Sequence, residues 1–151
     1  MRSQIVMSRT HAIAEVVESL VANSARSIDG AIYRFNKPHL AAALSNAVRR
    51  GVMVRVILDR NKYEESRSTR ELFSGGAIPF RLLHGRQGPG SKMHHKFVIL
   101  DGKTLLTGSY NWTPESEEQN YENLLVLREW EKIDLYRLEF EALWAESSPP
   151  A

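Results

Sequence analysis

Two short polar stretches flank an apolar strand in the second half of this chain. The first contains His94 and Lys96, and the second contains Ser109 and Asn111. A neutral imidazole can attack phosphorus and form a covalent phosphohistidine. Lysine supplies positive charge, while a hydroxyl and an amide donate hydrogen bonds to phosphoryl oxygens. This combination suits attack on a phosphodiester without a metal ion. Because it occurs once in the chain, we expect a second copy of the protein to complete the site.

The spacing of these residues predicts that their side chains meet at one end of a strand. His94 and Lys96 are two residues apart on an extended segment, so their side chains leave the same face. Residues 97–100 then carry the strand through the core, and Gly108 and Ser109 return one hairpin later. The acidic residues are not clustered with the histidines, and no helix carries two histidines one turn apart. We therefore expect no metal site and no cofactor.

Length and composition bound the class of protein. The 151 residues correspond to one domain, which we expect to span 1–151 with a frayed tail at 146–151. Cysteine is absent, which excludes disulfides and thiolate zinc sites. No run of eighteen apolar residues is present, so we expect no membrane span. The start does not resemble a signal peptide. A complete chain would be cytoplasmic, whereas removal of a leader would allow a periplasmic or membrane-anchored protein.

Charge is distributed unevenly although the formal net charge is only +2. Residues 49–103 contain 12 Lys and Arg against 5 Asp and Glu, and residues 104–151 contain 3 against 10. One interpretation of this asymmetry is a polyanion-binding face beside an acidic one. The alternative is ordinary solvated surface, because charges that are contiguous in sequence need not be contiguous in space. The candidate substrate-binding cations are Arg34, Arg60, Arg86 and Lys92.

Apolar periodicity predicts an α/β fold. Helices are expected over 10–23, 38–50, roughly 64–74 and 129–146, and strands over 27–35, 52–58, 78–83, 96–100, 104–107 and 121–128. The glycine-rich residues 84–92 are expected to form a flexible loop at the mouth of the site. Tyr33 is expected in the core. Since the first half alternates helix and strand, we predict a mixed, largely parallel central sheet flanked by helices on both faces.

The motif residues resemble those of the phospholipase D superfamily. That motif is His, any residue, Lys, four residues, Asp, six residues, Gly, a small residue, any residue and Asn, and here it is formed by His94, Lys96, Asp101, Gly108, Ser109 and Asn111. The short chain and the stretch Asn120-Tyr121-Glu122-Asn123 are similar to the single-motif branch, which includes bacterial Nuc-type endonucleases and mitochondrial Zucchini-type proteins. Zucchini-type proteins commonly carry a Cys/His zinc module, so the absence of cysteine favours the bacterial type.

The resemblance implies a role for each motif residue. His94 would be the nucleophile in one subunit and the general acid in the other, with both rings facing one phosphate across a two-fold axis. Lys96 and Asn111 would bind the phosphate, assisted by Ser109. Glu122 would hydrogen-bond the imidazole and fix its tautomer. Family enzymes need no divalent metal.

Asp101, the remaining polar motif residue, is expected to hold a turn rather than to touch the substrate. Three functions follow as hypotheses. The first is a metal-independent endonuclease that cleaves DNA or RNA as a homodimer through a covalent phosphohistidine. The second is a phosphodiesterase for a phospholipid such as cardiolipin, against which stands the lack of a basic amphipathic helix. The third is a nucleic-acid-binding module without turnover, against which stands the complete motif.

Overall fold

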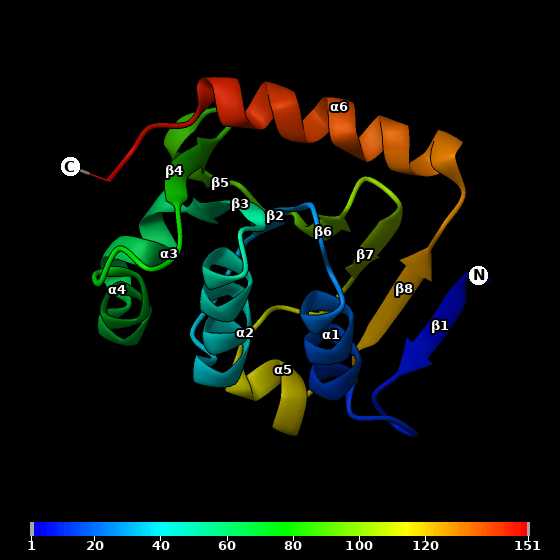
Figure 1. Cartoon of the computed structure of the whole chain (residues 1–151). Coiled ribbons are helices and arrows are strands. Elements are labelled where there is room, and N and C mark those ends of the chain that lie inside the picture. The colour runs from blue at the N-terminus through cyan, green and yellow to red at the C-terminus, as the bar shows by residue number, and fades with distance from the viewer. Residues whose placement is uncertain (1, 151) are drawn as a thin grey trace.

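The computed structural model describes residues 2–150, in which a single eight-stranded sheet carries helices on both faces (Figure 1). The strands are β1 (Gln4–Met7), β2 (Ser27–Ile32), β3 (Met53–Asp59), β4 (Phe80–Gly85), β5 (Gly88–Lys92), β6 (Lys96–Leu100), β7 (Thr104–Gly108) and β8 (Asn123–Leu127). The helices are α1 (Ile13–Ala22), α2 (Pro38–Arg49), α3 (Arg60–Glu65), α4 (Arg67–Phe73), α5 (Pro114–Glu118) and α6 (Trp130–Glu146).

The strand order is β1-β8-β7-β6-β2-β3-β4-β5. The predicted mixed α/β fold with helices on both faces is confirmed, but the prediction of a largely parallel sheet was wrong. Only β2–β3 and β3–β4 pair in parallel, because only these pairs are joined by helical crossovers. The other five pairs are antiparallel. Short turns make hairpins of β4–β5 and β6–β7, whereas β7–β8, β2–β6 and β1–β8 are joined by longer stretches of chain.

Two apolar layers cover the two faces of the sheet. Helices α1 and α2 pack on one face and α6 crosses the other (Figure 1). Strand β6 is buried on both sides, with Val98 and Leu100 in the first layer and Phe97 and Ile99 in the second. The alternation of side chains along a strand produces this division, which explains why β6 is apolar throughout.

The turn after β6 is fastened to the start of β2. Asp101 and Gly102 both have positive φ, at 56° and 64°. The Asp101 carboxylate accepts hydrogen bonds from the backbone N–H groups of Ala25, Arg26 and Ser27 at 2.7 to 3.2 Å. These contacts agree with the expectation that Asp101 holds the turn.

The glycine-rich segment is a hairpin rather than the expected loop. Residues 88–92 form β5, which pairs antiparallel with β4. A Cβ atom at Gly85 would lie 2.4 Å from the backbone N of Lys92, so only glycine permits this close approach. The glycines hide this strand from a prediction based on strand propensity, yet Gly85 is what allows β4 and β5 to pair. Strand β1, another element without a strong sequence signal, contributes only four residues at the sheet edge.

The C-terminal residues are held against the sheet instead of fraying at 147 and 148. Ser147 is buried, and Ser148 forms a bridge with Leu82 through backbone hydrogen bonds of 2.8 and 3.0 Å. The segment after α6 thus satisfies backbone groups of β4.

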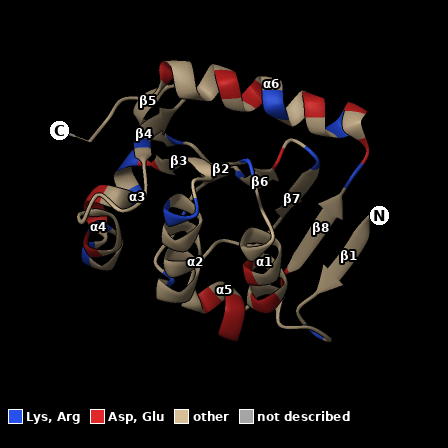
Figure 2. Ribbon diagram, in the orientation of Figure 1, with Lys and Arg blue, Asp and Glu red and all other residues tan. Residues whose placement is uncertain are grey.

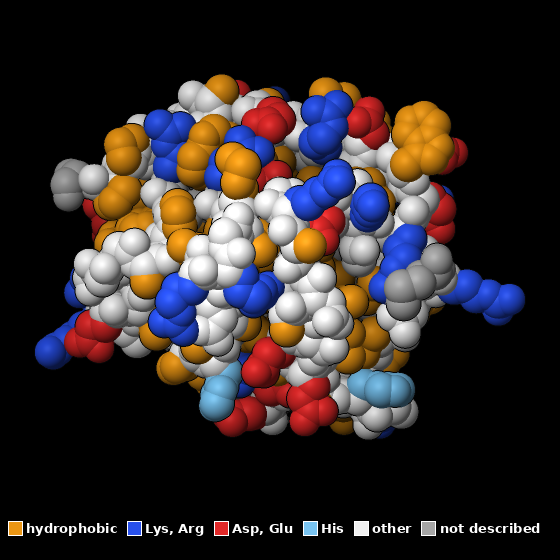
Figure 3. Space-filling model, in the orientation of Figure 1, with side chains coloured by type: hydrophobic (Ala, Val, Ile, Leu, Met, Phe, Trp, Pro, Cys, Tyr) orange, Lys and Arg blue, Asp and Glu red, His pale blue; other side chains and the backbone are white. Residues whose placement is uncertain are grey.

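Charged side chains are partly segregated in space. The acidic excess of the last third of the chain lies on α5 and α6, where α6 also carries interspersed cations (Figure 2). On the face seen in Figure 3, basic side chains lie among acidic and apolar ones, and acidic groups gather at the lower edge near α5. No helix within residues 2–150 is long and apolar enough to cross a membrane.

Candidate active site

His94 and Lys96 meet at the start of β6. His94 is exposed just before the strand, and Lys96, its first residue, is partly buried. Lys96 Nζ lies 3.3 Å from His94 Nδ1 and donates a hydrogen bond to the His94 carbonyl oxygen at 3.0 Å. The predicted placement on one face is therefore observed, and an ammonium group directly adjoins the candidate nucleophile.

The surroundings of His94 favour its neutral form. Burial lowers the pKa of the imidazole, and the positive charges of Lys96 and Lys92 lower it further, while the carboxylate of Asp59 opposes them. Burial also lowers the pKa of the Lys96 ammonium, against the opposing effect of Glu122. A neutral imidazole retains a lone pair for attack on phosphorus, so these electrostatics suit a nucleophile.

Tyr33 forms one wall of the site, which was not predicted from the sequence. It follows β2, and its ring centroid lies 4.5 Å from that of His94. The Nζ atoms of Lys96 and Lys62 lie 5.5 and 5.8 Å from the Tyr33 ring centroid, within the range of cation–π contacts. The expectation of burial is confirmed, and the ring also packs against the imidazole. Its neighbours in sequence carry no signal for this contact.

Gly108 and Ser109 bring the end of β7 to the site. Gly108 has φ +151°, and a Cβ atom there would lie 2.4 Å from the Asn123 carbonyl oxygen, so the close approach to β8 requires glycine. Ser109 Oγ accepts a hydrogen bond from the Asn123 backbone N–H at 3.1 Å and donates one to Glu122 Oε1. The other Glu122 oxygen accepts from Asn120 at 3.0 Å.

Glu122 forms no hydrogen bond with His94 within residues 2–150, although the resemblance to the phospholipase D superfamily implied one. Both of its carboxylate oxygens accept hydrogen bonds from residues of its own chain, Ser109 and Asn120. The histidine that does pair with a carboxylate is His95, whose ring lies 3.0 Å from Glu139 of α6. Lys96 approaches Nδ1 of His94, whereas attack through Nε2 requires a proton on Nδ1 and an acceptor for that proton. The described chain offers His94 no such carboxylate.

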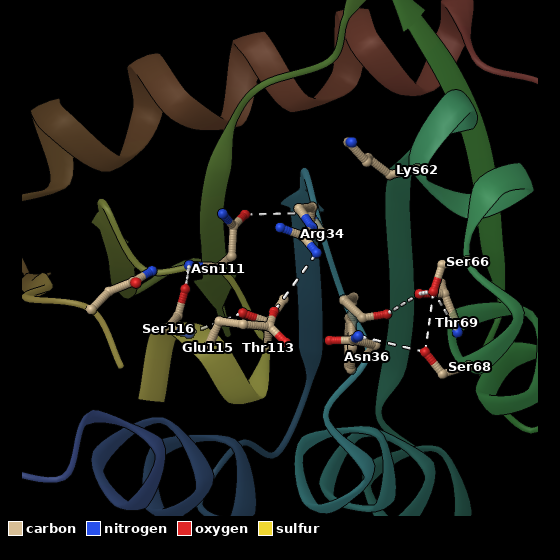
Figure 4. Close-up of polar contacts among 12 residues, drawn as sticks. Arg34, Asn36, Lys62, Ser66, Ser68, Thr69, Asn111, Thr113, Glu115 and Ser116 are labelled. Atoms are coloured by element: carbon tan, nitrogen blue, oxygen red, sulfur yellow. Dashed lines mark hydrogen bonds and ion pairs between the residues drawn. The ribbon is translucent and has the colours of Figure 1, made fainter. Parts of the chain in front are cut away.

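Asn111, two residues beyond Ser109, presents a side-chain amide to the site. Its Oδ1 atom accepts a hydrogen bond from the Arg34 backbone N–H at 3.3 Å, and its own backbone N–H donates to Ser116 Oγ at 3.3 Å (Figure 4). With Oδ1 occupied, the Nδ2 group is the donor that remains for a phosphoryl oxygen. The Arg34 side chain turns toward Glu115, 3.7 Å away in an exposed ion pair.

The predicted substrate-binding cations divide into three groups. Arg86 and Lys92 line a cavity of about 460 Å³ together with His94. Arg34 lines a smaller cavity of about 270 Å³ on the other side of Tyr33. Arg60, the first residue of α3, lines neither cavity. The structure thus brings Arg86 and Lys92 to the nucleophile, places Arg34 nearby, and leaves Arg60 outside.

Asp101 lies at the opposite end of β6 from His94 and is engaged by the turn described above. Burial raises the pKa of its carboxyl group, but the backbone hydrogen bonds from Arg26, Ser27 and Ala25 outweigh that effect and lower it. Its carboxylate is therefore engaged by backbone N–H groups at the end of β6 away from His94. In residues 2–150, no three His, Cys, Asp or Glu side chains are grouped as metal ligands would be.

Comparison with known proteins identifies the family. The model of the family described as cardiolipin synthase, PLD-like domain, matches residues 17–144. Human mitochondrial cardiolipin hydrolase is 36% identical over 138 residues, which cover 91% of this chain and 53% of that protein. The Xenopus laevis protein of the same name is 38% identical over 126 residues, covering 82% of this chain and 57% of the relative. The chain thus spans about half the length of these curated relatives.

Solved structures show the same fold over nearly the whole chain. NucT from Helicobacter pylori superposes with a TM-score of 0.88 at 22% identity, covering 99% of both chains. Nuc from Salmonella typhimurium, described as a phospholipase D family member, superposes with a TM-score of 0.86 at 25% identity, covering 96% of this chain and 95% of that one. The chain therefore belongs to the phospholipase D superfamily.

Proposed function

We propose that this chain is a metal-independent phosphodiesterase that cleaves DNA or RNA internally through a phosphohistidine on His94. The observation that carries the proposal is the approach of the Lys96 ammonium to the His94 ring, 3.3 Å from Nδ1. This cation and the free amide N–H group of Asn111 supply charge stabilisation for a phosphoryl group without a metal ion, beside a histidine with a lowered pKa.

The proposed reaction has two displacement steps. In the first, Nε2 of His94 attacks phosphorus, and the bond from phosphorus to the leaving oxygen breaks. An imidazolium, the His94 of a second copy, gives its proton to the leaving alkoxide, which departs as an alcohol. In the second step, water attacks phosphorus, that imidazole accepts the water proton, and the phosphorus–nitrogen bond breaks. Lys96 and Asn111 hold the phosphoryl oxygens throughout.

A homodimer with a shared site is part of the proposal. The motif occurs once in the chain, so one copy supplies one His94. Within residues 2–150, moreover, no carboxylate accepts from the His94 ring. A second copy placed across a two-fold axis would supply the general acid. It would also supply an acceptor for the Nδ1 proton, such as Glu122, in place of the Lys96 ammonium, which can only donate.

The basic residues beside His94 favour a nucleic acid. Arg86 and Lys92 line the cavity that His94 shares, and Arg34 and Lys62 line the cavity beyond Tyr33. Cations on both sides of a nucleophile match a substrate whose backbone continues past the scissile phosphate in both directions. A phospholipid headgroup ends after one phosphodiester, or after two in cardiolipin, and so offers no continuing backbone.

The second candidate is a phospholipid phosphodiesterase. Relatives that share more than a third of the aligned residues are named mitochondrial cardiolipin hydrolase. The cavity beside His94 also has apolar wall residues, Leu83, Met93 and Leu143, which suit an acyl chain. A third candidate, a binding module without turnover, is disfavoured by the assembled motif.

One set of incubations tests these alternatives. Purified protein and its His94→Ala variant are incubated in excess EDTA with labelled single- and double-stranded DNA and RNA, and separately with cardiolipin-containing vesicles. The proposal predicts nucleic-acid cleavage by the wild type alone. Release of phosphatidate without cleavage of any nucleic acid would transfer the assignment to a lipid. Tight, salt-sensitive binding with no turnover would support a binding module.

A further inference from the structure

The backbone on either side of His94 is anchored to two different strands. The Met93 N–H donates a 2.9 Å hydrogen bond to Oδ1 of Asp59, the last residue of β3. The carbonyl of His95 accepts a 2.8 Å hydrogen bond from the backbone N–H of Tyr33, beyond the end of β2. His94 itself lies just before β6, so these two contacts fix the 92–93 and 95–96 peptide units, one on each side of the short segment that carries His94.

Asp59 is a helix cap that is fully buried. It begins helix α3 as the N-cap, and Oδ2 accepts the Lys62 backbone N–H at 3.0 Å. A cap needs one acceptor, and Ser66 provides one to the next helix through its hydroxyl (Figure 4). Asp59 is 0% exposed and forms no salt bridge in the described chain. A buried carboxylate is costly unless its oxygens are hydrogen-bonded.

The second carboxylate oxygen of Asp59 explains why a carboxylate, rather than a hydroxyl, occupies this N-cap position. A serine or threonine hydroxyl offers one oxygen, whereas Asp59 caps α3 with one oxygen and holds Met93 with the other. Met93 is 3% exposed and belongs to the core layer beneath α6, so the hydrogen bond lies in a dry environment where it holds its geometry. The partners lie 34 residues apart in sequence, which makes this a tertiary contact with the residue before the nucleophile.

We propose that Asp59 is a positioning residue for His94, which fixes the Met93 peptide and thereby the direction in which the imidazole enters the site. The proposal rests on the proposed role of His94 as nucleophile. The charge of the Asp59 carboxylate also raises the pKa of the imidazole that it positions. Catalysis loses roughly a hundredfold when a reacting group is displaced by about 1 Å.

Charged and titratable groups surround His94 on several elements. Lys96, Lys92 and His95 lower the pKa of His94, and Asp59 raises it. The cavity that His94 shares is also lined by His84, Arg86, Glu139 and Glu146. Because Asp59 acts against the cations, its neutralisation is expected to lower the pKa of His94 further.

The test compares Asp59→Asn, Asp59→Ala and the control Ser66→Ala in the full chain. Ser66→Ala removes the N-cap of α4, and Ser66 forms no hydrogen bond with Met93 or His94. This variant therefore reports the effect of losing a helix cap without the contact to Met93. Exchange of the Met93 amide and the titration of the His94 ring are followed by NMR, and kcat and KM are measured on a cleavable oligonucleotide. Asp59→Asn is nearly isosteric, so it decides the question if Asp59→Ala fails to fold.

Three results are expected of the Asp59 variants and not of Ser66→Ala. The Met93 amide exchanges roughly tenfold faster in Asp59→Ala. The His94 titration moves to lower pH in Asp59→Asn. The value of kcat falls about 10- to 100-fold while KM changes by less than about threefold. An unchanged Met93 amide and an unchanged His94 titration in Asp59→Asn would overturn the proposal. Because both readouts are independent of turnover, they remain decisive if the wild type cleaves no nucleic acid.

Discussion

The ammonium group of Lys96 lies 3.3 Å from Nδ1 of His94, and the same ammonium donates to the carbonyl oxygen of His94. The two side chains of the motif are therefore in contact before any substrate binds. This contact keeps a positive charge beside the imidazole, where it disfavours protonation of the ring.

This electrostatic relationship predicts a specific pH dependence. The pKa of His94 lies below the ordinary value of about 6.5. Since the neutral ring is the nucleophile, kcat/KM is expected to fall as pH decreases through that lowered pKa. Lys92→Gln removes one of the charges that lower it, so the acidic limb should move to higher pH. Measurement of kcat/KM between pH 4.5 and 8 checks this, and a limb that stays in place or moves to lower pH would contradict the assignment.

Tyr33 provides a second prediction, which separates its ring from its hydroxyl. The ring packs against His94, while the hydroxyl makes no hydrogen bond within residues 2–150. Tyr33→Phe should therefore retain kcat within about twofold. Tyr33→Leu keeps an apolar side chain but loses the ring face, and kcat should fall roughly 10- to 100-fold because the imidazole is less well oriented. Equal loss in both variants would indicate that the hydroxyl, rather than the ring, is used.

Gly108 gives a prediction about the folding of the site. In Gly108→Ala the new Cβ atom would lie 2.4 Å from the Asn123 carbonyl oxygen, at a φ of +151°. Strain of this kind is expected to cost about 2–3 kcal/mol of unfolding free energy and to lower Tm by roughly 5–10 °C. Gly90→Ala is the matched control, because nothing lies within 4 Å of its Cβ position. Thermal unfolding followed by circular dichroism distinguishes them, and similar Tm values would refute the packing account.

The proposed nucleic-acid substrate predicts a salt dependence. In the His94→Ala background, the dissociation constant for single-stranded DNA is measured between 50 and 300 mM salt. Arg86→Gln and Lys92→Gln should each reduce the slope of log Kd against log salt by about 0.7, the value for one lost phosphate contact. Arg67→Gln is the control, since Arg67 is exposed on α4 and lines neither cavity. Equal slopes in all variants would place the substrate elsewhere.

Local signals in the sequence were sufficient to predict most of the helices and strands and the placement of His94 beside Lys96. The alternation of side chains put His94 and Lys96 on one face, and the doubly buried β6 was evident from its continuous apolar run. The helix expected over 38–50 is observed as α2, with Pro38 as its first residue and Gly51, at φ 92°, just beyond its end. Each of these features depends on neighbours within a few residues.

Features that depend on tertiary contacts were not predicted. Strand β5 is formed of residues with low strand propensity and exists because Gly85 allows β4 to approach closely. The packing of Tyr33 on His94 and the hydrogen bond from Met93 to Asp59 join residues far apart in sequence. Nothing in the immediate sequence of Asp59 distinguishes an ordinary helix cap from a residue that also holds the active-site strand.

The most direct measurement is a search for the covalent intermediate on His94. Wild-type protein is mixed with a short oligonucleotide in EDTA, quenched rapidly at alkaline pH, where a phosphorus–nitrogen bond survives, and digested for mass spectrometry. The account predicts a nucleotide adduct on the peptide containing His94 during turnover and no adduct in His94→Ala. Turnover at full rate with no adduct on His94, or an adduct on Ser109 instead, would contradict it.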